Sequence, residues 1–126
     1  MQYYKNEPMA LHNLRGIAGE EAAAGYLQGM GYHIQHRNWR TSFYEIDIIA
    51  VKDNIIHFIE VKTRHSLKYG HPEEQVSRKK FLNLKKAAEY FLVLNPYWKR
   101  IQFDILSITR LYGKEEEFLL IEDVYT

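Results

Sequence analysis

The chain has 126 residues, no cysteine, 46% hydrophobic residues and a formal net charge of +1. This length suits one domain that buries its own core, and the lack of cysteine excludes a disulfide framework. No apolar run approaches the ~18 residues of a membrane span, and the first residues lack the pattern of a signal peptide. We therefore expect a cytoplasmic protein that does not enter a membrane.

The first elements expected along the chain are a flexible arm at residues 1–10 and a helix from Asn13 to Gly31. Small and apolar residues recur at three- and four-residue steps on one face of that helix, which indicates packing against a sheet. Glu20 lies on the same face. Its carboxylate either belongs to a metal site or reaches water past small neighbours.

Residues 32–40 are expected to form the first strand, because apolar and polar residues alternate there, although imperfectly. The strand ends in the cluster Arg37-Asn38-Trp39-Arg40. Such a polar and aromatic cluster suits contacts with phosphates or bases, and it is equally compatible with an ordinary sheet edge.

A β-hairpin that carries ionisable side chains is the most informative part of the sequence. Two strongly apolar segments flank a two-residue turn at Asp53-Asn54. The first segment carries Asp47, and the second carries Glu60 and Lys62, which emerge on one face because strand side chains alternate. An unpaired charge beside a core costs about several kcal/mol, so three such residues suggest a functional site.

Two carboxylates at the end of a hairpin can share Mg²⁺, which takes oxygen ligands and keeps several waters. With an ammonium group beside them, such ligands suit the hydrolysis of a phosphodiester bond. The alternative is structural: Glu60 and Lys62 form an ion pair, and Asp47 caps a bend. The hairpin context favours the chemical site. His57 points away from Glu60 by strand alternation and is expected to pack or to lie at an edge.

The remaining expected elements are a loop over 64–75, a second helix over 77–94, and strands over 101–109 and 118–124. The predicted order is therefore αβββαββ within a single domain at 11–126. The last strand either belongs to the core or forms the interface of a homodimer.

The charges are distributed unevenly along the chain. Between residues 62 and 86 stand eight basic residues against two acidic ones, whereas the C-terminal tail is acidic. The basic segment suits the phosphate backbone of nucleic acid, and a solvated helix face explains it equally well. Within this segment, Arg64, Lys79 and Lys80 are the residues that we expect to contact the backbone.

Several motifs in register give the chain a family resemblance. They are Gly16-x-x-Gly19-Glu20 with Ala23 and Tyr26-Leu27, Gly31-Tyr32, Arg37-Asn38-Trp39-Arg40, Glu45-Ile46-Asp47, Phe58-Ile59-Glu60-Val61-Lys62-Thr63-Arg64 and Phe103-Asp104. With these motifs the chain resembles the YraN family of uncharacterised bacterial proteins, a branch of the PD-(D/E)xK nuclease superfamily that is similar to archaeal Holliday junction resolvases. The resemblance covers most of the chain. It implies a restriction-endonuclease-like α/β fold, with a mixed central sheet flanked by helices.

The resemblance also implies roles for particular residues. The catalytic carboxylates and lysine of the superfamily correspond to Asp47, Glu60 and Lys62, and the resolvase-like helix glutamate corresponds to Glu20. The implied metal is Mg²⁺ or Mn²⁺, held by Asp47, Glu60 and the backbone carbonyl of Val61.

Glu45 and Gln75 are further candidates, the latter because some superfamily nucleases keep a glutamine near the metal. Tyr44 stands where the family usually has glycine just before the Glu45-Ile46-Asp47 motif, which alters the backbone next to the implied metal.

We accordingly expect a magnesium-dependent endonuclease that hydrolyses phosphodiester bonds in DNA, structured or branched DNA in particular, in repair or recombination. The alternatives are a nucleic-acid-binding module that has lost turnover and a nuclease that acts on RNA. The residues expected to contact the nucleic acid are Arg37, Arg40, Arg64, Lys79 and Lys80.

Overall fold

The computed structural model describes residues 19–65 and 78–124. These residues form a helix at 19–29, β1 (His33–Arg40), β2 (Glu45–Lys52), β3 (Ile55–Arg64), α2 (Arg78–Leu94), β4 (Ile101–Thr109) and β5 (Glu117–Ile121). The order is αβββαββ, as predicted. The expected N-terminal arm and most of the loop at 64–75, including Gln75, lie outside the described residues.

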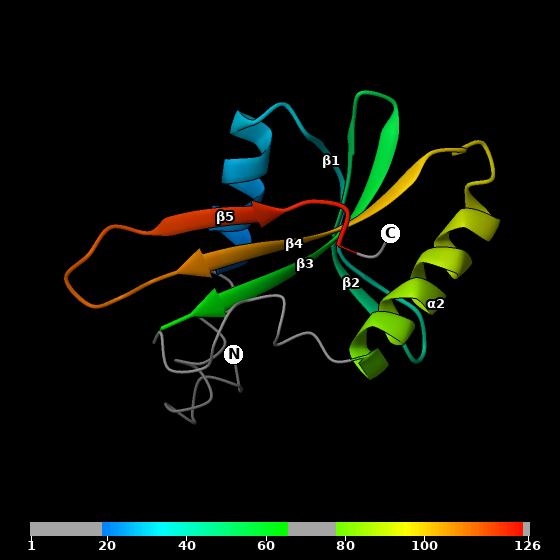
Figure 1. Cartoon of the computed structure of the whole chain (residues 1–126). Helices are drawn as coiled ribbons and strands as arrows, with labels where there is room; N and C mark the ends of the chain where they lie inside the picture. The colour runs from blue at the N-terminus through cyan, green and yellow to red at the C-terminus, as the bar shows by residue number, and fades with distance from the viewer. Residues whose placement is uncertain (1–18, 66–77, 125–126) are drawn as a thin grey trace, which may run out of the picture.

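The strands form one mixed sheet in the order β1-β2-β3-β4-β5. β1, β2 and β3 are consecutive antiparallel neighbours, β4 lies parallel to β3 because α2 connects them, and β5 returns antiparallel to β4. The helix at 19–29 lies on one side of this sheet and α2 on the other (Figure 1). The arrangement is consistent with a restriction-endonuclease-like core.

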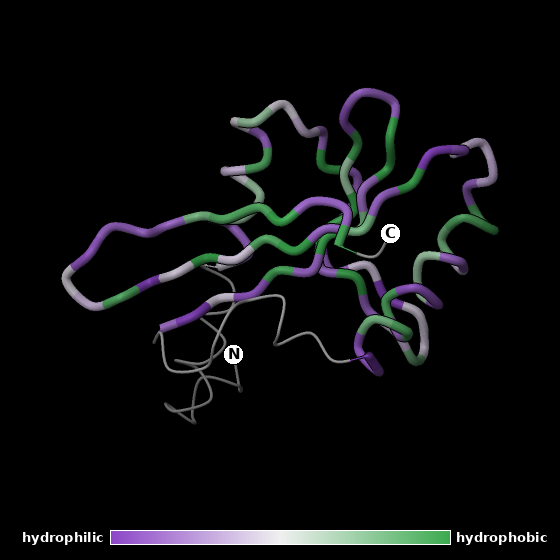
Figure 2. The backbone as a smooth tube through the Cα atoms, in the orientation of Figure 1, coloured by the Kyte–Doolittle hydropathy of each residue, from purple (hydrophilic) through white to green (hydrophobic). Residues whose placement is uncertain are grey.

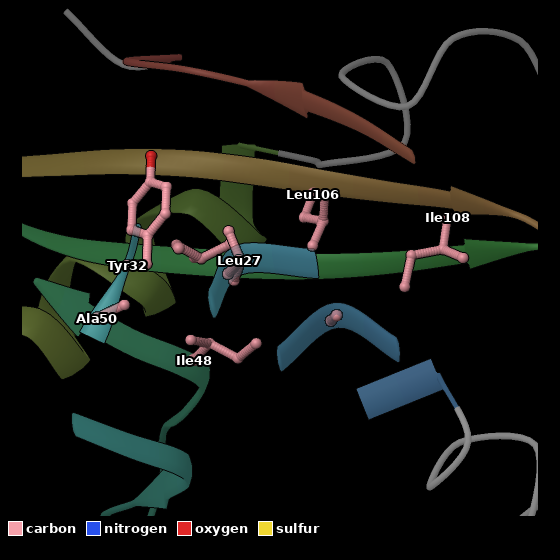
Figure 3. Packing of buried hydrophobic residues seen from close by; sticks show 8 residues of the cluster. Leu27, Tyr32, Ile48, Ala50, Leu106 and Ile108 are labelled. Atoms are coloured by element: carbon pink, nitrogen blue, oxygen red, sulfur yellow. The ribbon is translucent and has the colours of Figure 1, made fainter. Parts of the chain in front are cut away.

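Each face of the sheet has its own hydrophobic cluster. On the face of the first helix, Ala23 and Leu27 pack against residues of β2, β3 and β4 (Figure 3). On the opposite face, Phe91 of α2 packs against Phe58 of β3. Hydrophobic residues run along the central strands, and hydrophilic residues gather at turns and at the beginning of α2 (Figure 2). The central strands are therefore buried on both sides, which explains their nearly continuous apolar sequences.

Two turns follow the local rules that predicted them. Asp53 and Asn54 both have positive φ, 52° and 67°, as the two central residues of a tight hairpin turn between β2 and β3 require. Gly31, whose φ is 94°, lies in the turn that follows the first helix. There the Tyr32 amide donates to the carbonyl of Leu27, which caps the last turn of the helix.

The last strand is shorter than predicted, since β5 ends at Ile121 and does not reach Val124. The buried carboxylate of Asp104 accepts a hydrogen bond of 2.8 Å from the Asp123 amide, and Asp123 has a φ of 54°. This left-handed residue turns the chain away from an extended path, and the Val124 amide then donates to the carbonyl of Phe103. The apolar pattern of the segment did not reveal this turn.

Among residues 19–65 and 78–124, no helix is long and apolar enough to cross a membrane.

Candidate active site

The site begins where β2 separates from β3. The two strands pair from Lys52↔Ile55 to Ile48↔Ile59, and Asp47 lies one residue beyond the last pair. Its carboxylate Oδ2 accepts a hydrogen bond of 2.8 Å from the backbone amide of Val61. A side chain thus takes the place of a backbone partner at this point, and it fixes the Asp47 carboxylate at the edge of β3.

Glu60 and two lysines complete the cluster. Glu60 Oε1 lies 2.8 Å from Nζ of Lys80 and 3.4 Å from Nζ of Lys62. The Glu60 side chain is only 11% exposed, whereas that of Lys80 is 45% exposed. Asp47 is bonded to Val61, which lies between Glu60 and Lys62 in the sequence, so the structure brings together the carboxylates and the lysine that the hairpin predicted. It does so on the face of the sheet that α2 covers.

The pKa values in this cluster show how strongly its members affect each other. Burial, and then the neighbouring charge of Glu60, raise the pKa of Asp47 to about 7, although the Val61 amide opposes the shift. The pKa of Lys62 is lowered by burial and by Lys80. For Lys80, burial is the largest effect and lowers the pKa, but the hydrogen bonds to Glu60 and Lys62 and the charges of Glu60 and Asp47 together outweigh it, so the net shift of the pKa is upward. The charge of Glu60 thus opposes the ionisation of Asp47, and a bound cation would remove that opposition.

The donor set fits a hard divalent cation that keeps part of its water shell. Val61 presents its amide to Asp47, and the amide and carbonyl of one strand residue face the same edge, so its carbonyl faces that side too. Within the described ranges, no three His, Cys, Asp or Glu side chains gather into a metal site. Two carboxylates and one carbonyl leave positions for water and for a substrate phosphate, as Mg²⁺ requires.

Glu20 lies outside this cluster, on the helix that packs against the other face. Its Oε2 accepts a hydrogen bond of 2.9 Å from the side-chain amide of Asn38. Asn38 has a φ of 52° and lies in β1 between the residues paired with Ile46 and Ile48 of β2, which places it opposite Asp47. Glu20 therefore reaches the neighbourhood of Asp47 through Asn38, and its catalytic role stays a prediction.

The residues expected to contact nucleic acid occupy different positions. Arg37 and Arg40 form exposed ion pairs with Glu21 at 2.8 Å and Glu45 at 3.3 Å. Lys80 belongs to the carboxylate cluster, while its neighbour Lys79 is exposed on α2.

Arg64 is the remaining residue of that group, and strand alternation puts it on the face of Glu60 and Lys62. Its Nε is buried without a hydrogen-bond partner among the described residues. This arginine therefore lies on the same face as the cluster, near the end of β3.

A second polar cluster, buried at the other end of β3, was not predicted. Asp104 on β4 is fully buried, and its Oδ2 lies 2.6 Å from Nδ1 of His57. Its Oδ1 accepts hydrogen bonds from Gln102 and from the Asp123 amide. His57 packs as expected, and its ring also contacts Tyr32. The acidic residue inside the apolar run 101–108 was the signal in the sequence that could have indicated this pair.

The chain is similar to proteins of one family along most of its length. A model described as "Uncharacterised protein family UPF0102" matches residues 19–108, which include the whole candidate site. A UPF0102 protein of Syntrophomonas wolfei is 46% identical over 102 residues, which cover 80% of this chain and 89% of that protein. A UPF0102 protein of Chloroherpeton thalassium is 42% identical over 118 residues, and this match covers 87% of this chain and 92% of that protein.

Proposed function

We propose that this chain, which belongs to the uncharacterised protein family UPF0102, is a metal-dependent nuclease that hydrolyses phosphodiester bonds in DNA. One observation carries the proposal: the Asp47 carboxylate is hydrogen-bonded to the amide of Val61, the residue after Glu60, and the Lys62 ammonium lies 3.4 Å from the Glu60 carboxylate. The ion pairs of Glu60 with Lys62 and Lys80 explain one of these acids, whereas Asp47 is held by the Val61 amide beside Glu60, where burial and the Glu60 charge oppose its ionisation.

Each residue of the candidate site would have a distinct role in hydrolysis. Asp47, Glu60 and the carbonyl of Val61 would hold Mg²⁺ or Mn²⁺. When bound, such an ion polarises a phosphoryl oxygen and lowers the pKa of its water. Lys62 would orient the attacking water and balance negative charge that develops on the phosphoryl group. The oxygen of the attacking water would form the new bond to phosphorus as the bond to the leaving oxygen breaks. The water would lose its proton to solvent, and the leaving oxygen would take up a proton from solvent.

The surroundings of the site suit a polyanionic substrate. The first turn of α2 carries Arg78, Lys79 and Lys80, without an acidic residue, and Arg64 lies on the face of the carboxylate cluster. Lysine and arginine contacts to phosphates supply most of the affinity that does not depend on nucleic-acid sequence. Lys79→Ala is therefore expected to weaken binding to all DNA sequences and to flatten its salt dependence.

The test is cleavage of a panel of linear, flapped and four-way DNA and of RNA, in Mg²⁺ or Mn²⁺. Asp47→Asn, Glu60→Gln and Lys62→Ala should each abolish cleavage while circular dichroism shows an intact fold. Glu115→Gln removes an exposed carboxylate far along the chain from the site and should cleave as the wild type does. Undiminished cleavage in all three site variants, or DNA binding without any cleavage by the wild type, would overturn the proposal.

A further inference from the structure

A groove outside the carboxylate cluster runs between the turn at residues 41–44 and one side of α2. Two hollows of about 590 and 310 Å³ open along it, and Tyr44 and Tyr90 line both. Because they share these two residues, the hollows are neighbours and together make up the groove. It is large enough for a flat aromatic ligand and its neighbours.

Large aromatic side chains stand exposed along this groove. Phe43 is 86% exposed and Tyr90 is 59% exposed, although the next residue of α2, Phe91, is buried in the core. The substitution of either exposed ring would therefore leave the core unchanged. Exposed aromatic rings offer flat faces on which another ring can stack.

Two cationic side chains that can reach a phosphate line the groove. They are Arg40, which forms an exposed ion pair with Glu45, and Lys86, which shares the lining with the carboxylate of Glu89. Exposed ion pairs are weak, so a phosphate can compete for both cations. Lys79 lies seven positions before Lys86 and eleven before Tyr90, spacings that put all three on the same side of a helix. This side leads to the first turn of α2, where Lys80 contacts Glu60. The groove and the candidate active site therefore lie along the same helix.

We propose that this groove binds an unpaired segment of a nucleic-acid strand, with bases stacked on Phe43 and Tyr90 and phosphates held by Arg40 and Lys86. The choice of nucleic acid as the occupant rests on the proposed function. Bases inside a duplex have both faces covered and cannot stack on these rings, whereas unpaired bases can. The substrate class is therefore DNA with a single-stranded segment next to the scissile bond.

The test measures binding by fluorescence anisotropy in EDTA, so that no strand is cleaved. The probes are a labelled oligothymidylate and a duplex of the same length. Phe43→Ala and Tyr90→Ala should each weaken binding of the oligothymidylate by about 5- to 150-fold, the loss expected for one stacked base, and leave duplex binding unchanged.

Matched variants separate stacking from other causes. Tyr90→Phe keeps the ring and should bind as the wild type does, whereas Tyr90→Leu keeps apolar bulk without a flat aromatic face and should bind weakly. Tyr112, which is fully exposed in the turn before β5, is the control aromatic residue. Tyr112→Ala should have no effect on either probe.

Three results would overturn the inference: an equal loss on both probes, unchanged binding in both alanine variants, or full binding by Tyr90→Leu. Conversion of a dimer to a monomer by Tyr90→Ala in sedimentation would also overturn it, because a second copy of the chain would then fill the groove. The EDTA assay does not depend on hydrolysis. If the wild type does not cleave but the alanine variants lose oligothymidylate binding as expected, the proposed nuclease function is wrong and the groove proposal stands. If the wild type cleaves but the alanine variants bind oligothymidylate normally, only the groove proposal is wrong.

Discussion

The ammonium nitrogen of Lys80 on α2 lies 2.8 Å from Oε1 of Glu60 on β3. This contact joins the first turn of α2 to a nearly buried carboxylate of β3. The two residues are far enough apart in the sequence that no local pattern predicts their contact. A divalent cation must compete with this ammonium group for the carboxylate. Lys80 is half-exposed, so its side chain can leave toward solvent without rearranging the core.

The first prediction follows from this competition. Lys80→Ala should bind Mg²⁺ about 2- to 5-fold more tightly than the wild type, because the ion pair of a half-exposed lysine no longer has to be broken. Calorimetric titration of the metal without DNA measures the change. Lys79→Ala is the matched control, since Lys79 is exposed beside it. Weaker metal binding by Lys80→Ala would show that the lysine assists the cation.

Asp47 should make the stability of the metal-free protein depend on pH. Its pKa rises from 3.8 to about 7 in the folded chain, so the folded state holds this proton more tightly than the unfolded state. The free energy of unfolding contributed by this group is therefore highest below about pH 4, and it falls as pH rises to about 7.

Denaturant unfolding in EDTA over a pH series checks this sign. Asp47→Asn removes the titrating group, so the variant should gain stability relative to the wild type between about pH 4 and about pH 7. A stability difference that stays constant across this range would contradict the assignment.

The buried pair of Asp104 and His57 is expected to stabilise the domain. Asp104→Ala leaves His57, Gln102 and the Asp123 amide without their acceptor, and it should lower the free energy of unfolding by about 3–5 kcal/mol. Urea unfolding measures the loss, and the exposed substitution Glu115→Ala should cost less than about 0.5 kcal/mol. An Asp104→Ala protein as stable as that control would show that the pair is dispensable.

Two glycines of the first helix should respond in opposite ways to alanine. A Cβ on Gly19 would lie 2.8 Å from the Thr63 hydroxyl oxygen, whereas a Cβ on Gly25 would meet nothing within 4 Å. Gly25→Ala is therefore expected to stabilise the protein by about 0.5–1 kcal/mol. Gly19→Ala should destabilise it by about 1–3 kcal/mol because the packed helix must shift. Thermal unfolding distinguishes the two, and equal effects would contradict the close packing.

The sequence predicted those features that depend on local rules. Asp47, Glu60 and Lys62 could be placed together because a hairpin turn at Asp53-Asn54 fixes which strand residues are neighbours, and alternation fixes their faces. The small residues of the first helix indicated close packing, and Gly19 lies against Thr63 accordingly.

Features that depend on docking and on isolated backbone conformations were not predictable. Lys80 reaches Glu60 only because of the angle at which α2 crosses the sheet, which its own periodicity does not specify. The hydrogen bond between Glu20 and Asn38 depends on the left-handed backbone conformation of Asn38 within β1. The early end of β5 depends on Asp104, far from it in sequence.

The central claim is that Asp47 and Glu60 jointly hold one divalent cation, and a Mn²⁺ titration followed by electron paramagnetic resonance tests it most directly. The wild type and Glu115→Gln should each bind one ion per chain, whereas Asp47→Asn and Glu60→Gln should each lose that ion. Equal binding by all four proteins would contradict a shared site and, with it, the proposed chemistry.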